Sequence, residues 1–449
     1  MKRDTALALA PAAAERPADV FDALLIIAIF AGMGVLAWAA VATRVLAPLF
    51  EIAGRGDWHE LWLRPLAIWI GMGLVLMLGR TVFWLCYRPF SAVSAGEAPM
   101  LTVIIPAYNE GAMVEVAIRS VAAADYPRER LEIIAVDDGS TDDTWRYISR
   151  AAQRFPGLVS ALRLERNQGK RAALAEGFRR AQGDIVVTVD SDSEIERQTL
   201  AAIAGPFRDP RVGAVAGKVV VHNRRAGLIP RMLHVRFVLS FDFLRSAQSF
   251  FRTVYCCPGA LAAYRMTVVR QVLPQWEHQR FLGTECTYGE DRAMTNWILA
   301  AGYDTVYQRS AVVRTLVPET YTRLCRMYLR WDRSYIREEL HFARVVWKRP
   351  PLWRALAMYE STVTNLRFPV AYLSIALLLA HAVRDPASIL RMLVAIMVVS
   401  LVYVLYYLRS ERSWDFVFGI LYAYFSFFAL TWIFPYAALT LRARGWLTR

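Results

Sequence analysis

Long apolar segments at both ends of the chain constrain its fold more than any other feature. Two of them precede the middle of the chain and three follow it: 21–43, 65–87, 367–383, 389–408 and 414–441. An α-helix of about 20 apolar residues is long enough to cross the hydrocarbon core of a bilayer. A cleaved signal peptide explains 21–43 less well, because its apolar core is too long and a second apolar segment follows closely. The pattern predicts a multi-pass membrane protein.

The positive charge of the chain gathers near the ends of these segments. The formal net charge is +14, and Arg88, Arg409 and Arg442 each follow an apolar run. No nucleic-acid-binding motif accompanies the charge, so the positive-inside rule and attraction to anionic lipid explain it better. We therefore expect the middle of the chain to be cytoplasmic, at the inner (plasma) membrane, with the lipid bilayer as a partner and no nucleic acid. Arg80, near one end of its segment, is expected to snorkel to the headgroups.

Strand-like and helix-like patterns alternate between the two apolar groups, from about residue 95 to residue 310. Such alternation indicates an α/β domain. Residues 101–110 are typical of a buried strand broken by Pro106 and followed by a polar loop, and 131–136 and 184–189 are typical of two more buried strands. A helix is expected over 172–181.

Two acidic residues, Asp190 and Asp192, emerge where the third strand meets a loop. Two hard oxygen donors on one short loop can hold a divalent cation such as Mg²⁺ or Mn²⁺, which in turn can neutralise a diphosphate. The chemistry that this suggests is departure of a nucleotide diphosphate from a sugar. An acidic pair at a strand end is, taken alone, more often a solvated loop.

Two other polar motifs follow strands or precede a helix. The strand 131–136 runs into Asp137 and Asp138, and the carboxyl ends of parallel strands are where α/β sheets bind ligands. One of these two carboxylates is expected to accept a hydrogen bond from a base or a ribose hydroxyl, although an Asx turn alone would give the same pattern. Gly169 beside Lys170 and Arg171 at a helix start suits a phosphate or a sugar oxygen, and a basic helix start without a ligand explains it equally well.

Seven motifs occur in a fixed order along the chain: Asp137-Asp138-Gly139-Ser140, Asn167-Gln168-Gly169-Lys170-Arg171, Asp190-Ser191-Asp192, Arg245-Ser246-Ala247-Gln248-Ser249, Cys256-Cys257, Tyr288-Gly289-Glu290-Asp291-Arg292 and Arg330-Trp331. Their order resembles the membrane-embedded processive family 2 glycosyltransferases: hyaluronan synthase, the nodulation chitin-oligosaccharide synthase and, more distantly, cellulose synthase. The resemblance covers roughly residues 95–345 and the flanking spans. It implies an α/β GT-A fold, that of nucleotide-diphospho-sugar transferases, joined to transmembrane helices.

The resemblance also implies a division of the chain and roles for its residues. The parts would be an N-terminal tail with two transmembrane helices (1–94), a GT-A catalytic domain (95–310), interfacial amphipathic helices (311–366) and C-terminal transmembrane helices with a gating-like tail (367–449). The donor side would comprise Asp137 and Asp138 on the uridine, Lys170 on the donor, Asp190 and Asp192 on UDP and the metal ion, and Arg330 on the diphosphate. The acceptor side would comprise Trp331 stacked under the sugar and Cys257.

Asp291 would be the general base of that family. Inversion at the anomeric carbon needs a nucleophile that loses its proton as it attacks opposite the leaving UDP, so a base is required. Glu290 is expected to raise the proton affinity of Asp291. Favourable charges at a helix N-terminus would by themselves explain the same two residues.

Basic and aromatic residues alternate over 320–345, which predicts an amphipathic helix at the membrane surface, and 229–250 and 350–365 suggest two further ones. In the family, the motif Gln-x-x-Arg-Trp ends at Arg330 and Trp331. Met327 occupies the Gln position in this chain, which puts in doubt the hydrogen bond that Gln would make beside the acceptor or the diphosphate.

The last six residues resemble the family's gating segment, with Trp446, Thr448 and Arg449 folding over the donor. A Trp and an Arg next to a membrane are also common interface anchors. Three C-terminal crossings would place this tail on the side of the membrane opposite a cytoplasmic catalytic domain. Either 414–441 contains a re-entrant break, near Pro435, or the gating interpretation is wrong.

The leading hypothesis is an inverting processive synthase that transfers sugar from a UDP-sugar to a growing β-linked polysaccharide and extrudes the polymer. The expected donor is UDP-N-acetylglucosamine, with or without alternating glucuronate as in hyaluronan. A chitin-oligosaccharide synthase and a single-addition transferase acting on a lipid carrier are alternatives. A transporter or an inactive scaffold is a third, against which the intact Asp190, Asp192 and Asp291 argue. The five cysteines show no metal-ligand spacing and are expected to be thiols.

Overall fold

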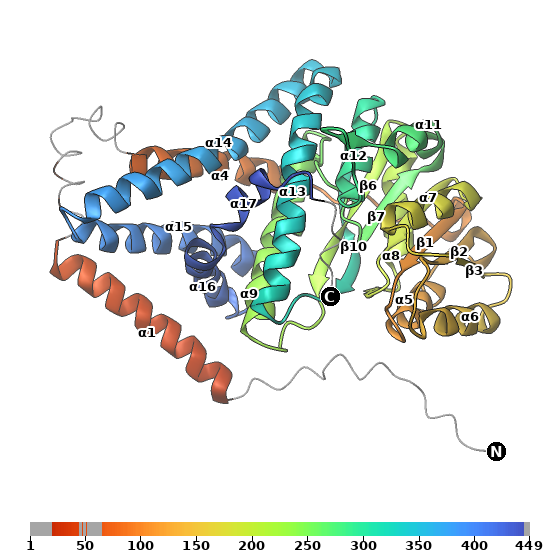
Figure 1. Cartoon of the computed structure of the whole chain (residues 1–449), viewed down its shortest axis with the longest axis horizontal. Coiled ribbons are helices and arrows are strands. Elements are labelled where there is room, and N and C mark those ends of the chain that lie inside the picture. The colour runs from red at the N-terminus through yellow and green to blue at the C-terminus, as the bar shows by residue number, and fades with distance from the viewer. Residues whose placement is uncertain (1–19, 45–46, 48–50, 52–64, 444–449) are drawn as a thin grey trace. The chain divides into compact units, whose positions relative to one another are not determined.

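The computed structural model describes residues 20–44, 47, 51 and 65–443, and it forms two compact units (Figure 1). The first, here called the sheet unit, comprises Cys86–Arg354 and the described chain from Thr431 onward. The second, the helical unit, comprises the described chain up to Leu85 together with Ala355–Leu430.

The sheet unit is built on a mixed sheet in the order β3-β2-β1-β4-β7-β6-β10-β5. Its strands are β1 Leu101–Ala107, β2 Leu131–Asp137, β3 Val159–Arg163, β4 Ile185–Val189, β5 Ser193–Ile195, β6 Val212–Val221, β7 Leu261–Arg265 and β10 Asp304–Thr315. Strands β1 to β4 are parallel, β7 is antiparallel to both β4 and β6, and β10 is parallel to β6. The carboxyl ends of the four parallel strands therefore lie at one edge, and the expected α/β fold is confirmed.

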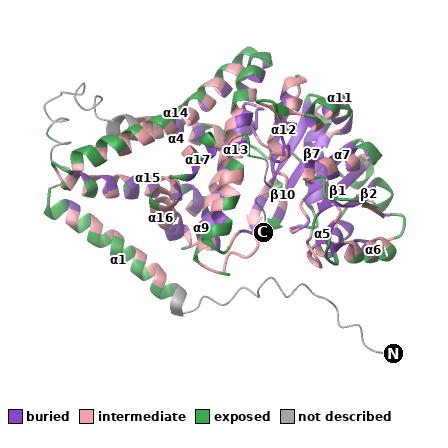
Figure 2. Cartoon of the chain, viewed as in Figure 1, coloured by how far each residue is buried: buried purple, intermediate pink, exposed green. Residues whose placement is uncertain are grey.

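Helices cover both faces of this sheet (Figure 1). The α-helices of the unit are α5 Met113–Ala122, α6 Thr144–Arg154, α7 Lys170–Arg180, α8 Thr199–Ala204, α9 Leu228–Phe237, α10 Arg245–Phe250, α11 Met266–Glu277, α12 Glu290–Ala300, α13 Tyr321–Val345 and α17 Ile433–Leu439. Of these, α13 packs on α12, and α17 packs on α13. Side chains of α7, α11 and α12 share one apolar core with the central strands, and Phe178, Trp276 and Ile298 lie within it. Figure 2 shows the strands as the most buried part of this unit. The core thus fixes the strand ends and the start of α12 with respect to each other.

Pro106 does not break the first strand as expected. Strand β1 continues to Ala107, and Pro106 pairs in register with Val136 of β2. The pairing of β1 with β4 on its other side ends at Ile104. A proline has no N–H for the ladder, and it is tolerated where a strand lacks a partner on one side.

The helical unit contains most of the apolar segments. Its helices are α1 Val20–Ala42, α4 Pro65–Cys86, α14 Pro351–Ala382, which begins in the sheet unit, α15 Ala387–Glu411, α16 Phe416–Phe425 and the π-helix η7 Ser426–Leu430. Within the described residues, three helices are long and apolar enough to cross a membrane: Ala23–Ala42, Pro351–Ala382 and Ala387–Glu411. A fourth span results if Phe416–Leu430 and Ile433–Leu439 are counted together. The expected membrane association is supported at this level.

Arg80 does not reach outward from its helix as expected. Its side chain is buried in the helical unit, where Nε lies 3.2 Å from Oε1 of Glu360 on α14 and Nη2 donates to Thr364 at 2.8 Å. A buried guanidinium is retained where a carboxylate and further acceptors surround it. The partner lies 280 residues away in the sequence, so the local pattern could not reveal it.

Two other expectations about the C-terminal half change. The segment 350–365 is not a separate interfacial helix, because α14 runs without interruption from Pro351 to Ala382. The segment 414–441 is broken, which is one of the two alternatives given above, but the break follows Leu430 rather than lying near Pro435. The helices on its two sides are bent by 44°. After this break, α17 belongs to the sheet unit, where Arg333 of α13 donates to Thr440 at 2.8 Å.

Candidate active site

Loops at the carboxyl edge of the parallel strands hold one another in place. Asn109, after β1, has a positive φ of 53° and accepts a hydrogen bond from the amide of Thr141 at 2.9 Å. In return, the amide of Asn109 donates to Oγ of Ser140 at 3.0 Å. Asparagine tolerates this left-handed conformation better than most residues. The ends of β1 and β2 are thereby joined beside the site.

Asp137 and Asp138, at the end of β2, have different surroundings. Both are buried. Asp137 accepts from the amide of Ser140 through Oδ1, while its Oδ2 lies 3.2 Å from Nε of Arg163 without the alignment of a hydrogen bond. Oδ2 of Asp137 is therefore a buried acceptor at the edge of the site, suited to a ligand donor.

Asp138 instead organises the loop that leads to Lys170. Its two oxygens accept from the amides of Gln168 and Gly169, each at 2.8 Å. Gly139, with φ of 67°, lets this loop lie against the end of β2, because a Cβ at position 139 would lie 2.4 Å from the carbonyl carbon of Arg166. Burial, and to a smaller extent the neighbouring Asp137, raise the pKa of Asp138. Of the two candidates for binding the nucleoside, Asp137 has a carboxylate oxygen that accepts no hydrogen bond, whereas both oxygens of Asp138 accept one.

Lys170, the first residue of α7, lies at the centre of a charged cluster. Its ammonium group donates to Oδ1 of Asp190 and lies 3.2 Å from Oε1 of Glu290. Arg171 turns the other way: its guanidinium lies 5.0 Å from the ring centroid of Trp276 and donates to that residue's carbonyl oxygen. Only Lys170 of the two cations therefore faces the end of β4.

Asp192 lies on the other side of the same loop, where β5 pairs with the end of β10. The hydroxyls of Ser193 and Thr315 each lie 3.3 Å from its Oδ1. Asp190 and Asp192 are both partly exposed. Among the residues that the structure describes, no group of three or more His, Cys, Asp and Glu side chains converges as a metal site would require. The protein offers these two carboxylates rather than a complete set of ligands.

Asp291 is the second residue of α12 and follows Glu290, the first. Its Oδ2 accepts from the amide of Gly259 at 3.1 Å and lies 3.7 Å from Sγ of Cys256, and its Oδ1 accepts from the amide of Arg292 at 2.7 Å. Burial, and after it the charge of Glu290, raise the pKa of Asp291. The effect of Glu290 has the direction expected from the sequence, although burial is the larger cause.

Glu290 has the opposite shift. Burial favours its neutral form, but the charge of Lys170 and more distant charges that include Arg330 outweigh it, so its pKa is lowered. The pKa values of these two adjacent carboxyls therefore move in opposite directions, which favours the ionised form of Glu290 and gives Asp291 the higher proton affinity.

Of the two cysteines, Cys256 and not Cys257 lies beside Asp291. Cys257 has no exposed surface and belongs to the apolar core, and burial raises its pKa to about 12. Because Cys257 packs among the apolar side chains of the core, nothing in its surroundings supports the acceptor role expected for it. Cys256 is partly exposed. All five cysteines are unpaired, as expected.

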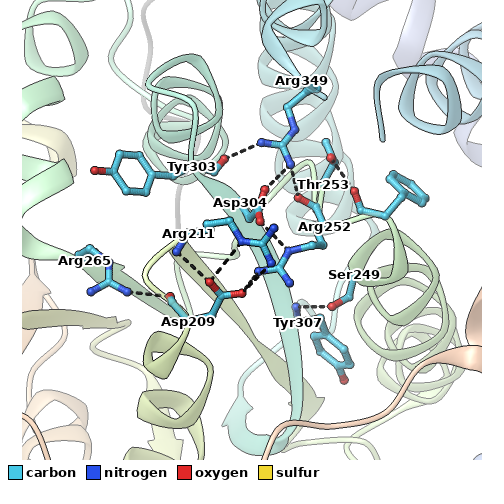
Figure 3. Close-up of polar contacts among 11 residues, drawn as sticks. Asp209, Arg211, Ser249, Arg252, Thr253, Arg265, Tyr303, Asp304, Tyr307 and Arg349 are labelled. Atoms are coloured by element: carbon cyan, nitrogen blue, oxygen red, sulfur yellow. Dashed lines mark hydrogen bonds and ion pairs between the residues drawn. The ribbon is translucent and has the colours of Figure 1, made fainter. Parts of the chain in front are cut away.

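A cluster of ion pairs surrounds Arg252 (Figure 3). Arg252 lies at the start of the segment that carries Cys256 and Gly259. Arg252, with φ of 54°, lies 2.6 Å from Oδ2 of Asp304 and also pairs with Asp209. Arg349 donates to the carbonyl oxygen of Arg252 at 2.9 Å and to Oδ1 of Asp304 at 2.6 Å. Arginine and aspartate contacts offset the cost of the left-handed conformation at the start of this segment.

Helix α13 of the sheet unit carries Arg330 and Trp331. Trp331 is about one-third exposed (36%), with ring contacts to Tyr328 and to Phe237 of α9. Gly289 lets this helix approach the start of α12, because its φ is 76° and a Cβ there would lie 1.9 Å from Oγ of Ser334. Neither Gly289 nor Gly259 could be recognised from sequence as a point of close approach, since their neighbours are far away in the chain.

The gating-like residues Trp446, Thr448 and Arg449 lie outside the described residues. The last described residue, Ala443, accepts a hydrogen bond through its carbonyl oxygen from the hydroxyl of Tyr288 at 3.0 Å.

Comparison with known proteins identifies a domain family and relatives of this chain. Residues 102–273 match a domain described as glycosyl transferase family 2. An N-acetylglucosaminyltransferase of Azorhizobium caulinodans is 32% identical over 352 residues, which are 78% of this chain and 87% of that protein. One of Rhizobium meliloti is 31% identical over 390 residues, 84% of this chain and 89% of that protein.

A solved structure gives the same result at the level of the fold. A mannosyltransferase from Pyrobaculum calidifontis, in complex with GDP-Man and Mn²⁺, has a TM-score of 0.58 and 25% identity, with 81% of this chain and 98% of that chain covered. The expected GT-A fold is thereby confirmed. The matched domain contains β1, β2 and β4, and the similarity to the relatives covers most of the length of those proteins. The chain therefore belongs to glycosyl transferase family 2 and is a glycosyltransferase.

Proposed function

We propose that this enzyme is an inverting N-acetylglucosaminyltransferase that uses UDP-N-acetylglucosamine and elongates a β-linked polymer. The observation that carries the proposal is the convergence of Lys170, Asp190 and Glu290 beside Asp291. Lys170, a cation suited to a diphosphate, thus lies close to Asp291, a carboxylate suited to act as a base. Transfer from a nucleotide sugar to a hydroxyl requires both groups in one site. The names of the relatives support the choice of sugar.

On the donor side, Asp137 accepts from the uracil base through its buried Oδ2, and Asp138 keeps the loop before Lys170 in place. Lys170 and Arg330 supply positive charge to the diphosphate. Trp331 offers a partly exposed ring on which an acceptor sugar stacks.

The donor set at the end of β4 fits a divalent cation. Mg²⁺ and Mn²⁺ in nucleotide sites need only one or two carboxylates, because phosphate oxygens and water complete their shells. Asp190 and Asp192 are two partly exposed carboxylates on one loop, and they would hold the cation. When bound, it would neutralise charge on the departing diphosphate. The mannosyltransferase structure with Mn²⁺ supports this assignment.

On the acceptor side, Asp291 takes the proton of the sugar hydroxyl as that oxygen forms its bond to the anomeric carbon. The bond from this carbon to the diphosphate oxygen breaks on the opposite face, and UDP leaves with the electron pair. The raised pKa of Asp291 makes it a better proton acceptor than an exposed carboxylate. Attack opposite to departure inverts the anomeric configuration and yields a β-linkage from an α-linked donor.

The helices that are long and apolar enough to cross a membrane support a processive synthase at the inner membrane, with its catalytic domain cytoplasmic and its polymer extruded. A transferase that adds one sugar to a lipid carrier is the second candidate. The names of the relatives support N-acetylglucosamine as the transferred sugar. We therefore favour a polymer of N-acetylglucosamine alone over hyaluronan, in which glucuronate alternates.

The test is an incubation of the purified enzyme with Mg²⁺ or Mn²⁺ and each UDP-sugar, alone and in pairs, followed by sizing of the products. UDP-N-acetylglucosamine alone should give oligomers or polymers. Products only when UDP-glucuronate is also present would identify a hyaluronan-type enzyme. A product with a single added sugar on a lipid would contradict processive elongation.

A further inference from the structure

The ammonium group of Lys170 occupies a position between two carboxylates from different elements. Asp190 follows β4, and Glu290 begins α12. Lys170 donates to Oδ1 of Asp190 and lies 3.2 Å from Oε1 of Glu290. All three side chains are largely buried: Lys170 is 20% exposed, Asp190 29% and Glu290 9%. One cation thus already neutralises the carboxylate at which a divalent cation would bind.

We propose that Lys170 is the resident counter-ion of the donor site before the nucleotide binds: it keeps free divalent cations from Asp190, and it turns from Asp190 to Glu290 and the diphosphate when the cation arrives with that diphosphate. The inference rests on the proposed function, because it takes Asp190 as a ligand of the cation. It adds an order of binding, in which the divalent cation enters together with the nucleotide rather than before it.

Electrostatics supports the exclusion of a cation without nucleotide. An ammonium group and a divalent cation that share one carboxylate oxygen repel each other at contact distance, and little water intervenes in a partly buried cluster. A diphosphate removes this conflict, since its oxygens bind the divalent cation and attract the ammonium group as well.

The geometry of Gly259 supports Glu290 as the alternative partner. A Cβ built on Gly259 would lie 2.9 Å from Nζ of Lys170, 3.6 Å from Oδ1 of Asp190 and 3.8 Å from Oε1 of Glu290. The backbone of Gly259 therefore borders all three groups and closes one side of the cluster. On release from Asp190, the ammonium group already has Glu290 within reach, so its long side chain needs only a small change.

Binding of Mn²⁺ to the purified full-length enzyme, measured from the free-ion signal in electron paramagnetic resonance, tests the proposal without any turnover. Without nucleotide, Lys170→Gln should bind Mn²⁺ at least about tenfold more tightly than the wild type, because the competing charge is gone. Lys170→Arg keeps the charge and should bind as weakly as the wild type. Adding Asp190→Asn to Lys170→Gln should abolish the gain, which separates this site from adventitious Mn²⁺ binding.

A wild-type measurement covers the case in which Lys170→Gln does not fold. UDP should tighten Mn²⁺ binding to the wild type, and Mn²⁺ should tighten UDP binding by the same factor. The proposal is overturned if Lys170→Gln gains no affinity, or if the wild type binds Mn²⁺ equally well with and without UDP. A wild type that binds neither Mn²⁺ nor UDP would instead contradict the proposed function itself.

Discussion

The backbone amide of Gly259 lies 3.1 Å from Oδ2 of Asp291. The hydrogen bond fixes one oxygen of the proposed base, and the same glycine borders Lys170, Asp190 and Glu290. One residue without a side chain thus lies where the donor side and the acceptor side of the site meet. Its size and its amide have separate consequences that substitution can distinguish.

Gly259→Ala should weaken donor binding while the fold is kept. Alanine retains the amide that donates to Asp291, but its methyl group would lie 2.9 Å from Nζ of Lys170. We expect a rise of about tenfold in the KM for the UDP-sugar, since small displacements at a reacting centre have large effects. Steady-state kinetics and the melting temperature test this together. A lower melting temperature with an unchanged KM would show that Gly259 matters only for packing.

Glu290→Gln should move the acid limb of the kcat profile to lower pH. The general base must be deprotonated, so kcat falls as the pH falls through the pKa of Asp291. That pKa is raised by burial and by Glu290, and loss of the neighbouring charge lowers it toward the usual range for Asp. The measurement is kcat against pH at saturating donor, with Glu290→Asp as a charge-conserving control. An acid limb that stays in place would remove Glu290 from the control of the base.

Asp192→Ala should weaken donor binding in a manner that depends on the divalent cation. The substitution removes one of the two carboxylates at the end of β4, so higher Mg²⁺ or Mn²⁺ concentrations should partly restore binding. Titration of UDP at several metal concentrations measures this. Arg197→Ala is a matched control, because its ion pair with Asp125 is exposed and contacts none of the site residues. Equal turnover with and without any divalent cation would contradict the metal assignment.

Met327→Gln should preserve activity or raise it by up to about tenfold, the value of roughly one restored hydrogen bond. A thioether is a weak acceptor and no donor, whereas the amide of Gln is both. Met327 is partly exposed in α13, so an amide there keeps access to water and the melting temperature should change little. Initial rates and melting temperatures are the readouts. A large fall in both would mean that the site has diverged from the family's acceptor geometry, and would weaken the roles given to Arg330 and Trp331.

Local sequence patterns were sufficient to place β1, β2 and β4 and the acidic residues at the ends of β2 and β4. The β-branched run before Asp190 forms β4, and the helix expected over 172–181 is α7, which begins two residues earlier at Lys170. These features depend on neighbours in the chain. A break in 414–441 was one of two alternatives that the topology left open, and its expected place near Pro435 was wrong.

Contacts between distant segments explain what the sequence could not reveal. Glu360, which keeps Arg80 inside the helical unit, is separated from it by 280 residues. Cys256, and not the adjacent Cys257, faces Asp291 because of the direction that the chain takes after Arg252. Contacts of Arg252 with Asp304 and Arg349 hold the chain there. The need for glycine at position 289 comes from Ser334 on another helix.

The most direct test of the account compares Asp291→Asn with the wild type for transfer and for UDP binding. The substitution is nearly isosteric and removes only the basicity that the transition state requires. Transfer of N-acetylglucosamine should fall by at least about a hundredfold, the lower range for loss of a general base, while UDP binds with nearly the same affinity. Normal turnover with lost UDP affinity would contradict the account, because Asp291 would then belong to the donor side.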